Sequence, residues 1–302
     1  MDLYNYTVNS FLDRLANPRP ILLDGATGTE LERRGVDTGT PIWSAMALLD
    51  APQIVEQIHR DYLDAGAEVI ITNTFRTHRY NLEKLGMGGQ AVSLTSLAVA
   101  IARKAVRASG KIAWVAGSMS PLEDSYSTAN PLTRDQYLRE HREMARNLAA
   151  AGVDLLLIET MKDIVEAEAA AQAASETGLP FGVSFICKPD GSLLSGDSIA
   201  DAVKAVEVHE PAFLGINCTA APTLDVALKG LRSATRLPIA VYANPGHTED
   251  YQTWGETEAT QPVAYCRFAE HWIELGGHLV GGCCGTRPEH IAALKSIAVV
   301  HE

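Results

Sequence analysis

The chain has few cysteines and no long apolar segment. Its 302 residues include five cysteines, too few for the disulfide framework that stabilises many secreted domains. No uncharged apolar run approaches the ~18 residues that would suggest a transmembrane helix. Residues 1–6 lack the basic and apolar regions of a secretory signal. These absences predict a protein of a reducing compartment, the cytoplasm, with no membrane as a partner.

Positive charge is also scarce. The chain has 25 lysine and arginine residues against 37 aspartate and glutamate residues, a formal net charge of −12. Nucleic acids and anionic membranes bind basic protein surfaces, so we expect neither as a partner. The glycine-rich segment 24–30 matches neither the dinucleotide-binding fingerprint nor the phosphate-binding P-loop. A nucleotide or phosphate ligand is therefore disfavoured.

The chain does contain a regular alternation of apolar and amphipathic segments. Eight short runs are apolar throughout, which is typical of parallel strands buried on both faces: 21–23, 68–72, 112–117, 155–158, 181–186, 213–217, 239–242 and 278–280. Helical patterns lie at 8–15, 51–66, 91–109, 133–150, 163–176, 198–208, 223–234 and 262–274 and at the C-terminus. This pattern predicts an α/β fold, a (β/α)8 TIM barrel with parallel strands formed by a single domain over 1–302. A doubly wound open sheet is the alternative.

Three of the five cysteines lie in glycine-containing motifs after two of the predicted strands. Cys283 and Cys284 are adjacent and flanked by glycines, and Cys218 follows another apolar run. Three thiolates with one open position form a catalytic zinc site if those strands are neighbours. The flanking glycines permit backbone angles that turn both adjacent sulfurs toward one point. Because an adjacent cysteine pair is not the usual zinc knuckle, packing in the core is the alternative.

The segment after the paired cysteines has the pattern of a helix start. Thr286 is the expected N-cap, Pro288 the first helical position and Glu289 the capping-box residue. A helix N-terminus just after Cys284 would favour the thiolate over the thiol.

Polar residues occur at the ends of several predicted strands. The C-terminal strand ends of a barrel share one face, where active sites are built. The residues at these ends are Asp24, Thr72, Glu159, Cys218, Asn244, Cys283 and Cys284. We therefore predict an active site at this face. Asp24 is a candidate ligand-binding carboxylate, with a turn or cap role as the alternative.

Several of these motifs together resemble one protein family. They are 24–31 (DGATGTEL), 72–75 (TNTF), 158–160 (IET), 196–198 (GDS), 215–218 (GINC) and 281–286 (GGCCGT). The combination is similar to the homocysteine S-methyltransferases, a family that includes enzymes using S-methylmethionine or S-adenosylmethionine, the betaine enzyme, and the homocysteine domain of cobalamin-dependent methionine synthase. The resemblance extends from about Ile21 to Ile291.

The resemblance implies a function and a set of site residues. It implies a barrel that transfers a methyl group to homocysteine and makes methionine, with Zn²⁺ held by Cys218, Cys283 and Cys284. By the same resemblance, Asp24 and Glu159 receive the amino group of homocysteine. Gly25 and Thr72 would bind its carboxylate, largely through backbone groups. Asn217 is expected either to orient the Cys218 loop or to bind substrate.

The methyl donor is predicted from departures and from length. Many relatives have Gly-Pro-x-Gly after the third strand, whereas this chain has Ser118–Asp124 at the start of a loop, 118–132, that we expect to face the donor. The chain is too short for folate and cobalamin modules and for the extended arm of the betaine enzyme. A sulfonium donor is therefore predicted. Alternatives are betaine or a methyl carrier protein as donor, selenohomocysteine or another thiol as acceptor, and a non-catalytic zinc-containing binding or regulatory module.

A sulfonium donor also suits the residues that are present. A thiolate is the attacking nucleophile, and a bound metal lowers the pKa of a thiol. Attack on a sulfonium methyl releases a neutral thioether, so no strong general acid is required. None stands out in the sequence.

The remaining candidates have less distinctive surroundings. Cys187 follows the fifth predicted strand and is expected in the core or at the rim, and Cys266 is expected to pack within a helix. His247 is expected in a solvated loop, with substrate contact as the alternative. Trp43 and Phe75 offer aromatic faces for a cationic donor, with packing as the default. The sequence leaves the oligomeric state open.

Overall fold

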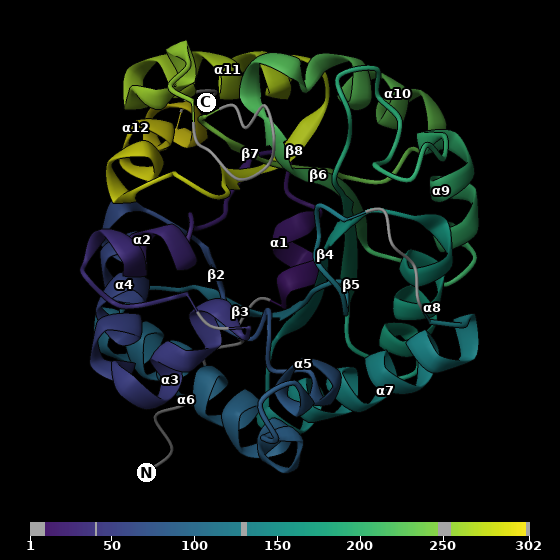
Figure 1. The fold of residues 1–302 in the computed structure, drawn as a ribbon. Helices are drawn as coiled ribbons and strands as arrows, with labels where there is room; N and C mark the ends of the chain where they lie inside the picture. The colour runs from purple at the N-terminus through teal and green to yellow at the C-terminus, as the bar shows by residue number, and fades with distance from the viewer. Residues whose placement is uncertain (1–9, 40, 128–131, 247–254, 300–302) are drawn as a thin grey trace, which may run out of the picture.

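The computed structural model describes residues 10–39, 41–127, 132–246 and 255–299, and within them eight parallel strands form a barrel ringed by helices (Figure 1). The strands are β1 (Ile21–Leu22), β2 (Val69–Ile71), β3 (Trp114–Met119), β4 (Leu155–Met161), β5 (Phe181–Phe185), β6 (Phe213–Ala220), β7 (Ile239–Asn244) and β8 (Gly277–Gly282). They pair in the order β1-β8-β7-β6-β5-β4-β3-β2, and a parallel bridge between Leu23 and Val69 joins the two ends of this series. The predicted barrel is confirmed, and the open-sheet alternative is wrong.

The longer helices lie close to their predicted positions. The helices are α1 (Phe11–Leu15), α2 (Gly28–Arg33), α3 (Ala47–Asp50), α4 (Pro52–Ala65), α5 (Arg79–Glu83), α6 (Ala91–Ser109), α7 (Arg134–Ala151), α8 (Ile164–Ser175), α9 (Ile199–Glu207), α10 (Asp225–Ala234), α11 (Pro262–Glu274) and α12 (Pro288–Val299). Local signals explain the bounds of α7: the Thr133 side chain accepts from the Gln136 N–H at its start, and Gly152 ends it in the left-handed conformation. The short helices α2, α3 and α5 were not predicted, because they have too few turns to show a periodic apolar pattern. No described helix is long and apolar enough to cross a membrane.

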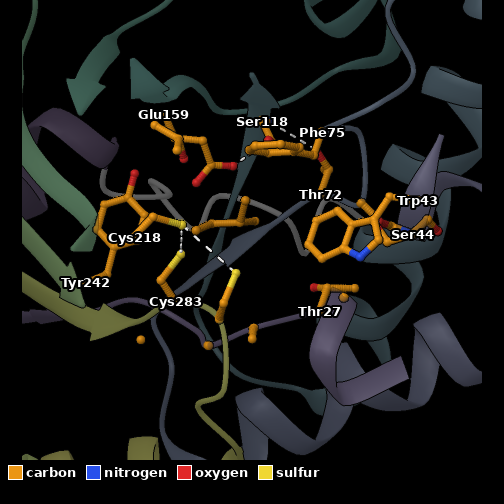
Figure 2. A pocket seen from close by; sticks show the side chains of 18 residues that line it. Thr27, Trp43, Ser44, Thr72, Phe75, Ser118, Glu159, Cys218, Tyr242 and Cys283 are labelled. Atoms are coloured by element: carbon orange, nitrogen blue, oxygen red, sulfur yellow. Dashed lines mark hydrogen bonds between the residues drawn. The ribbon is translucent and has the colours of Figure 1, made fainter. Parts of the chain in front are cut away.

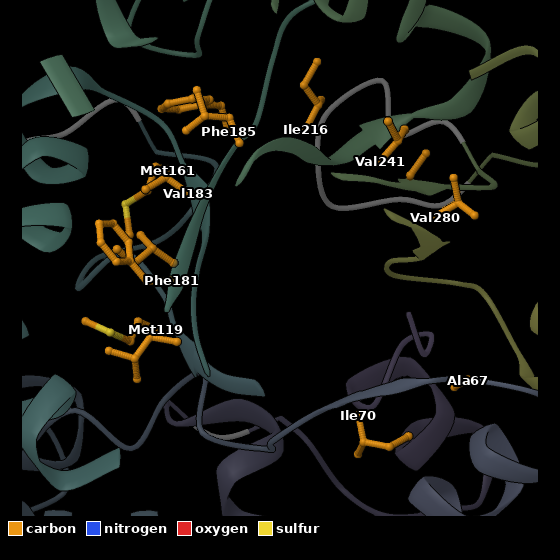
Figure 3. Close-up of a cluster of buried hydrophobic side chains, with 14 of the residues drawn as sticks. Ala67, Ile70, Met119, Met161, Phe181, Val183, Phe185, Ile216, Val241 and Val280 are labelled. Carbon is orange, nitrogen blue, oxygen red and sulfur yellow. The ribbon is translucent and has the colours of Figure 1, made fainter. Parts of the chain in front are cut away.

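The strands are apolar throughout because both of their faces are buried. Along β7, Ala240 and Tyr242 belong to the cluster inside the barrel, whereas Ile239 and Val241 pack toward the helices. Figure 3 shows part of the outer cluster, contributed by several strands. Alternate side chains therefore enter two separate cores, which explains why no polar–apolar alternation appears in the sequence.

The helix α1 closes the end of the barrel at which the strands begin. Figure 1 shows α1 in the centre of the ring. The ring of Phe11 meets those of Trp114 and Phe213 edge-on, with centroids 6.1 Å away in each case. The apolar spacing predicted a helix here, but no local pattern indicated that this helix would fill the end of the barrel. Its predicted residues 8 and 9 lie outside the described part of the chain.

Five strands extend past their predicted ends, and β4 and β6 extend furthest. The predictions end β4 at Ile158 and β6 at Asn217, whereas the strands continue to Met161 and Ala220. Their pairing shifts register between Ile158 and Met161 and between Asn217 and Ala220. Thr160 and Cys218 have positive φ angles of 64° and 51°. Such angles are strained for residues other than glycine and cluster at functional sites.

Candidate active site

The sulfurs of three cysteines meet at the C-terminal end of the barrel. Cys218 lies in β6, and Cys283 and Cys284 directly follow β8, with β7 between the two strands. The Cys218 Sγ is 2.7 Å from the Cys283 Sγ and 4.0 Å from the Cys284 Sγ, and all three lie within 4.8 Å of one another (Figure 2). Among the described residues, no fourth cysteine, histidine or carboxylate completes this group.

Glycines allow the paired cysteines to approach β1. A Cβ added at Gly281 would lie 2.6 Å from the Leu23 Cβ, and one at Gly282 would lie 2.3 Å from the Thr286 Oγ1. The Thr286 hydroxyl accepts from the Ala26 N–H at 3.1 Å and donates to the Cys283 carbonyl at 2.7 Å. The helix begins only at Pro288. The predicted role of Thr286 as a helix cap is therefore corrected, because its hydroxyl fastens the cysteine turn to the loop after β1.

Asn217 links the two strained strand segments. Its Oδ1 accepts from the Thr160 N–H at 2.8 Å, and its Nδ2 donates to the Thr160 Oγ1 at 2.7 Å. The same Nδ2 lies 3.9 Å from the Cys283 Sγ. Asn217 is fully buried, and its role in orienting the Cys218 loop stays a prediction. Its contact with substrate stays a prediction.

Glu159 occupies a buried position beside the thiols. It accepts a hydrogen bond from the Ser118 Oγ at 2.5 Å, and Figure 2 shows it opposite Tyr242 and near Ser118. Burial raises the pKa of Glu159 to about 7, although hydrogen bonds from Ser118 and Tyr242 oppose the rise. Its charged form is therefore poorly stabilised by the protein alone.

Thr72 contributes to the position of Ser118. Its hydroxyl accepts from the Ser118 N–H at 3.1 Å. Its own N–H donates to the Ala116 carbonyl at 2.9 Å in the barrel. The Thr72 N–H is therefore already bonded within the barrel. A contact between Thr72 and the carboxylate of a ligand stays a prediction.

Asp24 is a buried carboxylate with only part of its hydrogen-bonding capacity used. Its Oδ2 accepts from the Ile71 N–H at 2.9 Å, whereas its Oδ1 has no hydrogen-bond partner. Burial, followed by repulsion from Glu159, raises the pKa of Asp24 well above its ordinary value, against the effect of the Ile71 N–H. Asp24 is fully buried, and both its chain neighbour Gly25 and its hydrogen-bond partner Ile71 line a cavity beside the thiols. Two carboxylates that repel each other in a buried site favour a cationic ligand between them.

Two cavities that share several lining residues border the thiols. The inner chamber, about 90 Å³, is lined by Gly25–Gly28, Trp43, Ser44, Ile71–Asn73, Phe75, Ser118, Glu159, Thr160, Cys218, Tyr242 and Gly282–Cys284. The outer chamber, about 220 Å³, is lined by Thr29, Glu32, Trp43, Phe75, Arg76, Asp124–Tyr126, Thr160, Cys218 and Cys284. Both chambers include Cys218 and Cys284, so a group in either one reaches the sulfurs.

The donor set of the cysteine group suits a soft divalent metal. Thiolates select zinc and similar ions, and sulfurs bound to one zinc stand roughly 3.8 Å apart in a tetrahedral site. The 4.0 Å distance between the Cys218 and Cys284 sulfurs is close to this value, while the Cys218 and Cys283 sulfurs, at 2.7 Å, would have to separate by about 1 Å. Contact with Cys218 and burial raise the pKa of the Cys283 thiol well above its ordinary value. A bound cation would act in the opposite direction and favour their thiolate forms.

Comparison with known proteins identifies the family. The sequence profile described as homocysteine S-methyltransferase matches residues 21–298. The chain belongs to the homocysteine S-methyltransferase family. It is 32% identical to homocysteine S-methyltransferase YbgG of Bacillus subtilis over 92% of this chain and 94% of that protein. It is 28% identical to a selenocysteine methyltransferase of Astragalus bisulcatus, with 92% of each chain covered.

A solved structure of this family has the same fold. The metallated form of the Escherichia coli homocysteine methyltransferase MmuM superposes with a TM-score of 0.82 at 30% identity, covering 94% of this chain and 98% of that chain. The chain is therefore an enzyme, a methyltransferase. This membership is what the sequence motifs predicted, and it counts against a non-catalytic module.

The other predicted candidates lie in different surroundings. Cys187 and Cys266 are buried in the main core and lie outside the sulfur group, as predicted. Trp43 and Phe75 pack edge-on with centroids 5.9 Å apart, and both line the two chambers. His247 lies outside the described residues.

Several site residues were not predicted. Thr160 and Tyr242 line the inner chamber, and Asn244, predicted only at the shared strand ends, donates from its Nδ2 to the Cys218 carbonyl at 2.9 Å. The loop predicted at 118–132 begins later than expected, because Ser118 and Met119 belong to β3. Ser118 lines the inner chamber and Asp124–Tyr126 line the outer one, while residues 128–131 of this loop lie outside the described part of the chain. Thr160 follows Glu159 in one of the family motifs, and this was a usable signal. In the sequence, Tyr242 is one more residue of an apolar strand. Its position beside Glu159 could not be predicted, because the two residues come together only when the barrel forms.

Proposed function

We propose that this methyltransferase, a single domain over 1–302, moves a methyl group from a small sulfonium compound to the sulfur of homocysteine and yields methionine. The observation that carries the proposal is the group of three thiols, Cys218, Cys283 and Cys284, which borders both chambers. These thiols would hold Zn²⁺. The similarity to homocysteine methyltransferases, one of them solved in a metallated form, supports the assignment.

The acceptor would occupy the inner chamber. Its ammonium group would be received by Asp24 and Glu159, two buried carboxylates whose pKa values are raised chiefly by burial. The Asp24 Oδ1, which has no partner, gains one in this arrangement. Its carboxylate would meet the loop at Gly25 and the hydroxyl-rich segment at Thr72, both of which line the chamber. Asn217 would act through Thr160 and the cysteine turn as a positioning residue.

The transfer needs a deprotonated sulfur and correct alignment. When bound, zinc would lower the pKa of the acceptor thiol so that the thiolate is present at neutral pH. The proton of this thiol leaves to solvent. A lone pair of the thiolate sulfur forms the new S–CH₃ bond while the bond between that methyl carbon and the donor sulfur breaks, and the donor leaves as a neutral thioether. The rigid walls of the two chambers hold the reacting atoms in line, which supplies rate through orientation.

The proposal is tested by methionine formation. The zinc-loaded protein is supplied with homocysteine and separately with S-methylmethionine, S-adenosylmethionine or betaine. We expect turnover with a sulfonium donor, lost on chelation and recovered on adding zinc. Absence of methionine with every donor, despite one bound zinc per chain, would contradict the proposal.

The acceptor is the second point to test. The chain is similar to a selenocysteine methyltransferase as well as to homocysteine enzymes, and a selenolate would suit the same thiol group. The assay therefore includes selenohomocysteine and selenocysteine beside homocysteine. A higher kcat/KM for either selenol would reassign the preferred acceptor and leave the chemistry unchanged.

A further inference from the structure

The side chain of Tyr126 reaches the sulfur group from a segment, residues 120–127, that contains no cysteine. It packs against the small apolar cluster that includes Cys218, and Cys283 and Cys284 pack against the same cluster. It also lines the outer chamber beside two of these thiols. An aromatic residue from a separate loop is therefore part of the immediate surroundings of the sulfurs.

The hydroxyl group of Tyr126 is a hydrogen-bond partner of the Cys218 sulfur. A phenol has an ordinary pKa of about 10 and is protonated at neutral pH, and burial raises the pKa of Tyr126 further. A protonated phenol can donate its O–H. In this contact the tyrosine oxygen is therefore the donor and the sulfur the acceptor.

Buried polar side chains hold the start of this segment. The Leu122 N–H donates to the Glu166 Oε1 at 2.7 Å, and the Asn81 Nδ2 donates to the Leu122 carbonyl at 2.5 Å. Glu166 and Asn81 are at most 1% exposed. Both backbone groups of Leu122 are thus bound by side chains of other elements, α8 and α5, which fixes the segment on the barrel.

A second buried side chain holds the segment on both sides of Tyr126. Lys162 directly follows β4 and is only 2% exposed. Its Nζ donates to the carbonyls of Asp124 and Ser127 at 3.0 and 2.7 Å. The backbone at Tyr126 cannot move away from the thiols without breaking these bonds. A group held by rigid neighbours in this way keeps its contact geometry.

A hydrogen bond to a metal-bound thiolate affects the sulfur and the ion together. It stabilises the lone pairs of the sulfur, which then gives less charge to the ion. The ion becomes more effective in lowering the pKa of a further thiol that binds to it. Groups that contact the ligands of a metal, rather than the metal itself, typically change its affinity by about 10–100-fold.

We propose that Tyr126 is a positioning residue of the zinc site, which donates a hydrogen bond to the Cys218 sulfur and orients this sulfur toward the ion. The inference rests on the proposed function and adds to the three cysteines a residue from a different loop. It assigns to the segment 120–127 a role in retaining the metal. The same hydrogen bond helps the ion to activate the acceptor thiol.

A tyrosine-to-phenylalanine pair of variants tests this assignment. Tyr126→Phe removes the hydroxyl and keeps the ring. Tyr80→Phe is the matched control, because the Tyr80 hydroxyl also bonds to the segment, at Glu123, while Tyr80 is not among the described residues that line the two chambers. In chelator competition, the dissociation constant of zinc should be about tenfold larger in Tyr126→Phe and should change by less than about twofold in Tyr80→Phe.

The cobalt-substituted protein separates the hydrogen bond from a general loosening of the loop. Charge-transfer absorption from a thiolate to Co²⁺ needs less energy when the sulfur lone pairs are not stabilised by a hydrogen bond. This absorption should therefore move to longer wavelength in Tyr126→Phe. It should keep its position in Tyr80→Phe, where the sulfurs keep their partners.

The outcomes distinguish this inference from the proposed function, because neither measurement requires turnover. An unmoved absorption in Tyr126→Phe would overturn the inference, as would a zinc affinity equal to that of the unaltered protein. Equal losses of zinc affinity in both variants would overturn it too, since they would assign the effect to the loop as a whole. If both variants behave as expected and the unaltered protein forms no methionine, only the proposed reaction is contradicted.

Discussion

The two ends of the barrel use buried polar and strained groups in opposite ways. At the end where the strands begin, Arg14 is only 9% exposed, yet its guanidinium bonds to Glu68 and to the carbonyls of Arg19 and Pro20, all at 2.8–3.0 Å. At the other end, the Asp24 Oδ1 is buried without a hydrogen-bond partner. At the first end, the buried charged group has protein partners. At the second end, one oxygen of a buried carboxylate has none.

The difference extends to packing and backbone. The lower end, where the strands begin, is filled by Phe11 against Trp114 and Phe213. At the upper end, Thr160 and Cys218 adopt positive φ angles and the walls enclose two chambers. Because the same strands connect both ends, we infer that the lower end and the helices stabilise the strain and charge of the upper end. Four substitutions test this division.

The largest effect is expected at the thiols. Cys283→Ser should lose both bound zinc and activity, by at least ~1,000-fold in kcat/KM, because two thiols remain for a site that needs three protein ligands. Zinc is measured by mass spectrometry of the dialysed protein, and the fold by circular dichroism. Cys187→Ala is the control: this buried thiol lies in the core, so zinc should remain. A Cys283→Ser protein with full zinc and turnover would remove Cys283 from the metal site.

At the lower end, Phe11→Ala should act on stability alone. Removing a buried aromatic side chain costs about 3 kcal/mol in the free energy of unfolding, and Phe11 is 3% exposed. The measurement is urea unfolding, with Leu12→Ala, at a position that is 49% exposed, as the control within about 0.5 kcal/mol. The KM for homocysteine should stay within twofold. A large change in KM at equal zinc content would show that the two ends are not separable.

Glu159 should give the upper end a characteristic pH dependence. Its pKa is about 7 in the folded protein against 4.5 for the free group, because burial outweighs the hydrogen bonds from Ser118 and Tyr242 that lower it. The folded state therefore binds its proton more tightly, so the free energy of unfolding of the zinc-free protein falls as pH rises from about 4.5 to 7. The full loss is about 3 kcal/mol.

The matched comparison isolates this contribution of Glu159. Between pH 5 and 8, the free energy of unfolding should fall by about 3 kcal/mol less in Glu159→Gln than in the unaltered protein. Both are measured by urea unfolding in the presence of chelator. Glu83→Gln, at an exposed position on α5, should leave the pH dependence unchanged. Parallel curves for Glu159→Gln and the unaltered protein would mean that Glu159 is ordinarily charged in the folded state.

The smallest of these effects is expected for the link between the strained strands. Asn217→Ala removes two buried hydrogen bonds to Thr160 and should cost about 2 kcal/mol. It should also weaken zinc binding, because the cysteine turn loses a neighbour. Chelator competition measures the second effect. Thr160→Ala removes only one of the two bonds and should cost about half as much. Unchanged zinc affinity in Asn217→Ala would limit Asn217 to a structural role.

The sequence by itself determined the elements and the residues at their ends. The apolar runs and the helix signals at residues such as Thr133 and Gly152 are local, so the helices α6 and α11 have their predicted bounds and the other long ones differ by at most two residues. The glycine-flanked Cys283 and Cys284 and the motif around Cys218 indicated the sulfur site for the same reason. A signal carried within a few residues does not depend on the rest of the chain.

Only the tertiary structure decided how these residues act together. Cys218 and Cys283 are 65 positions apart in the chain. They meet because β6 and β8 are close in the barrel, with only β7 between them. The raised pKa of Glu159, the strain at Thr160 and Cys218, and the charged wall formed by Glu32, Arg76 and Asp124 all depend on neighbours from other strands and loops. Burial and close contact between distant segments have no local signal, because they arise only when the ring of strands closes.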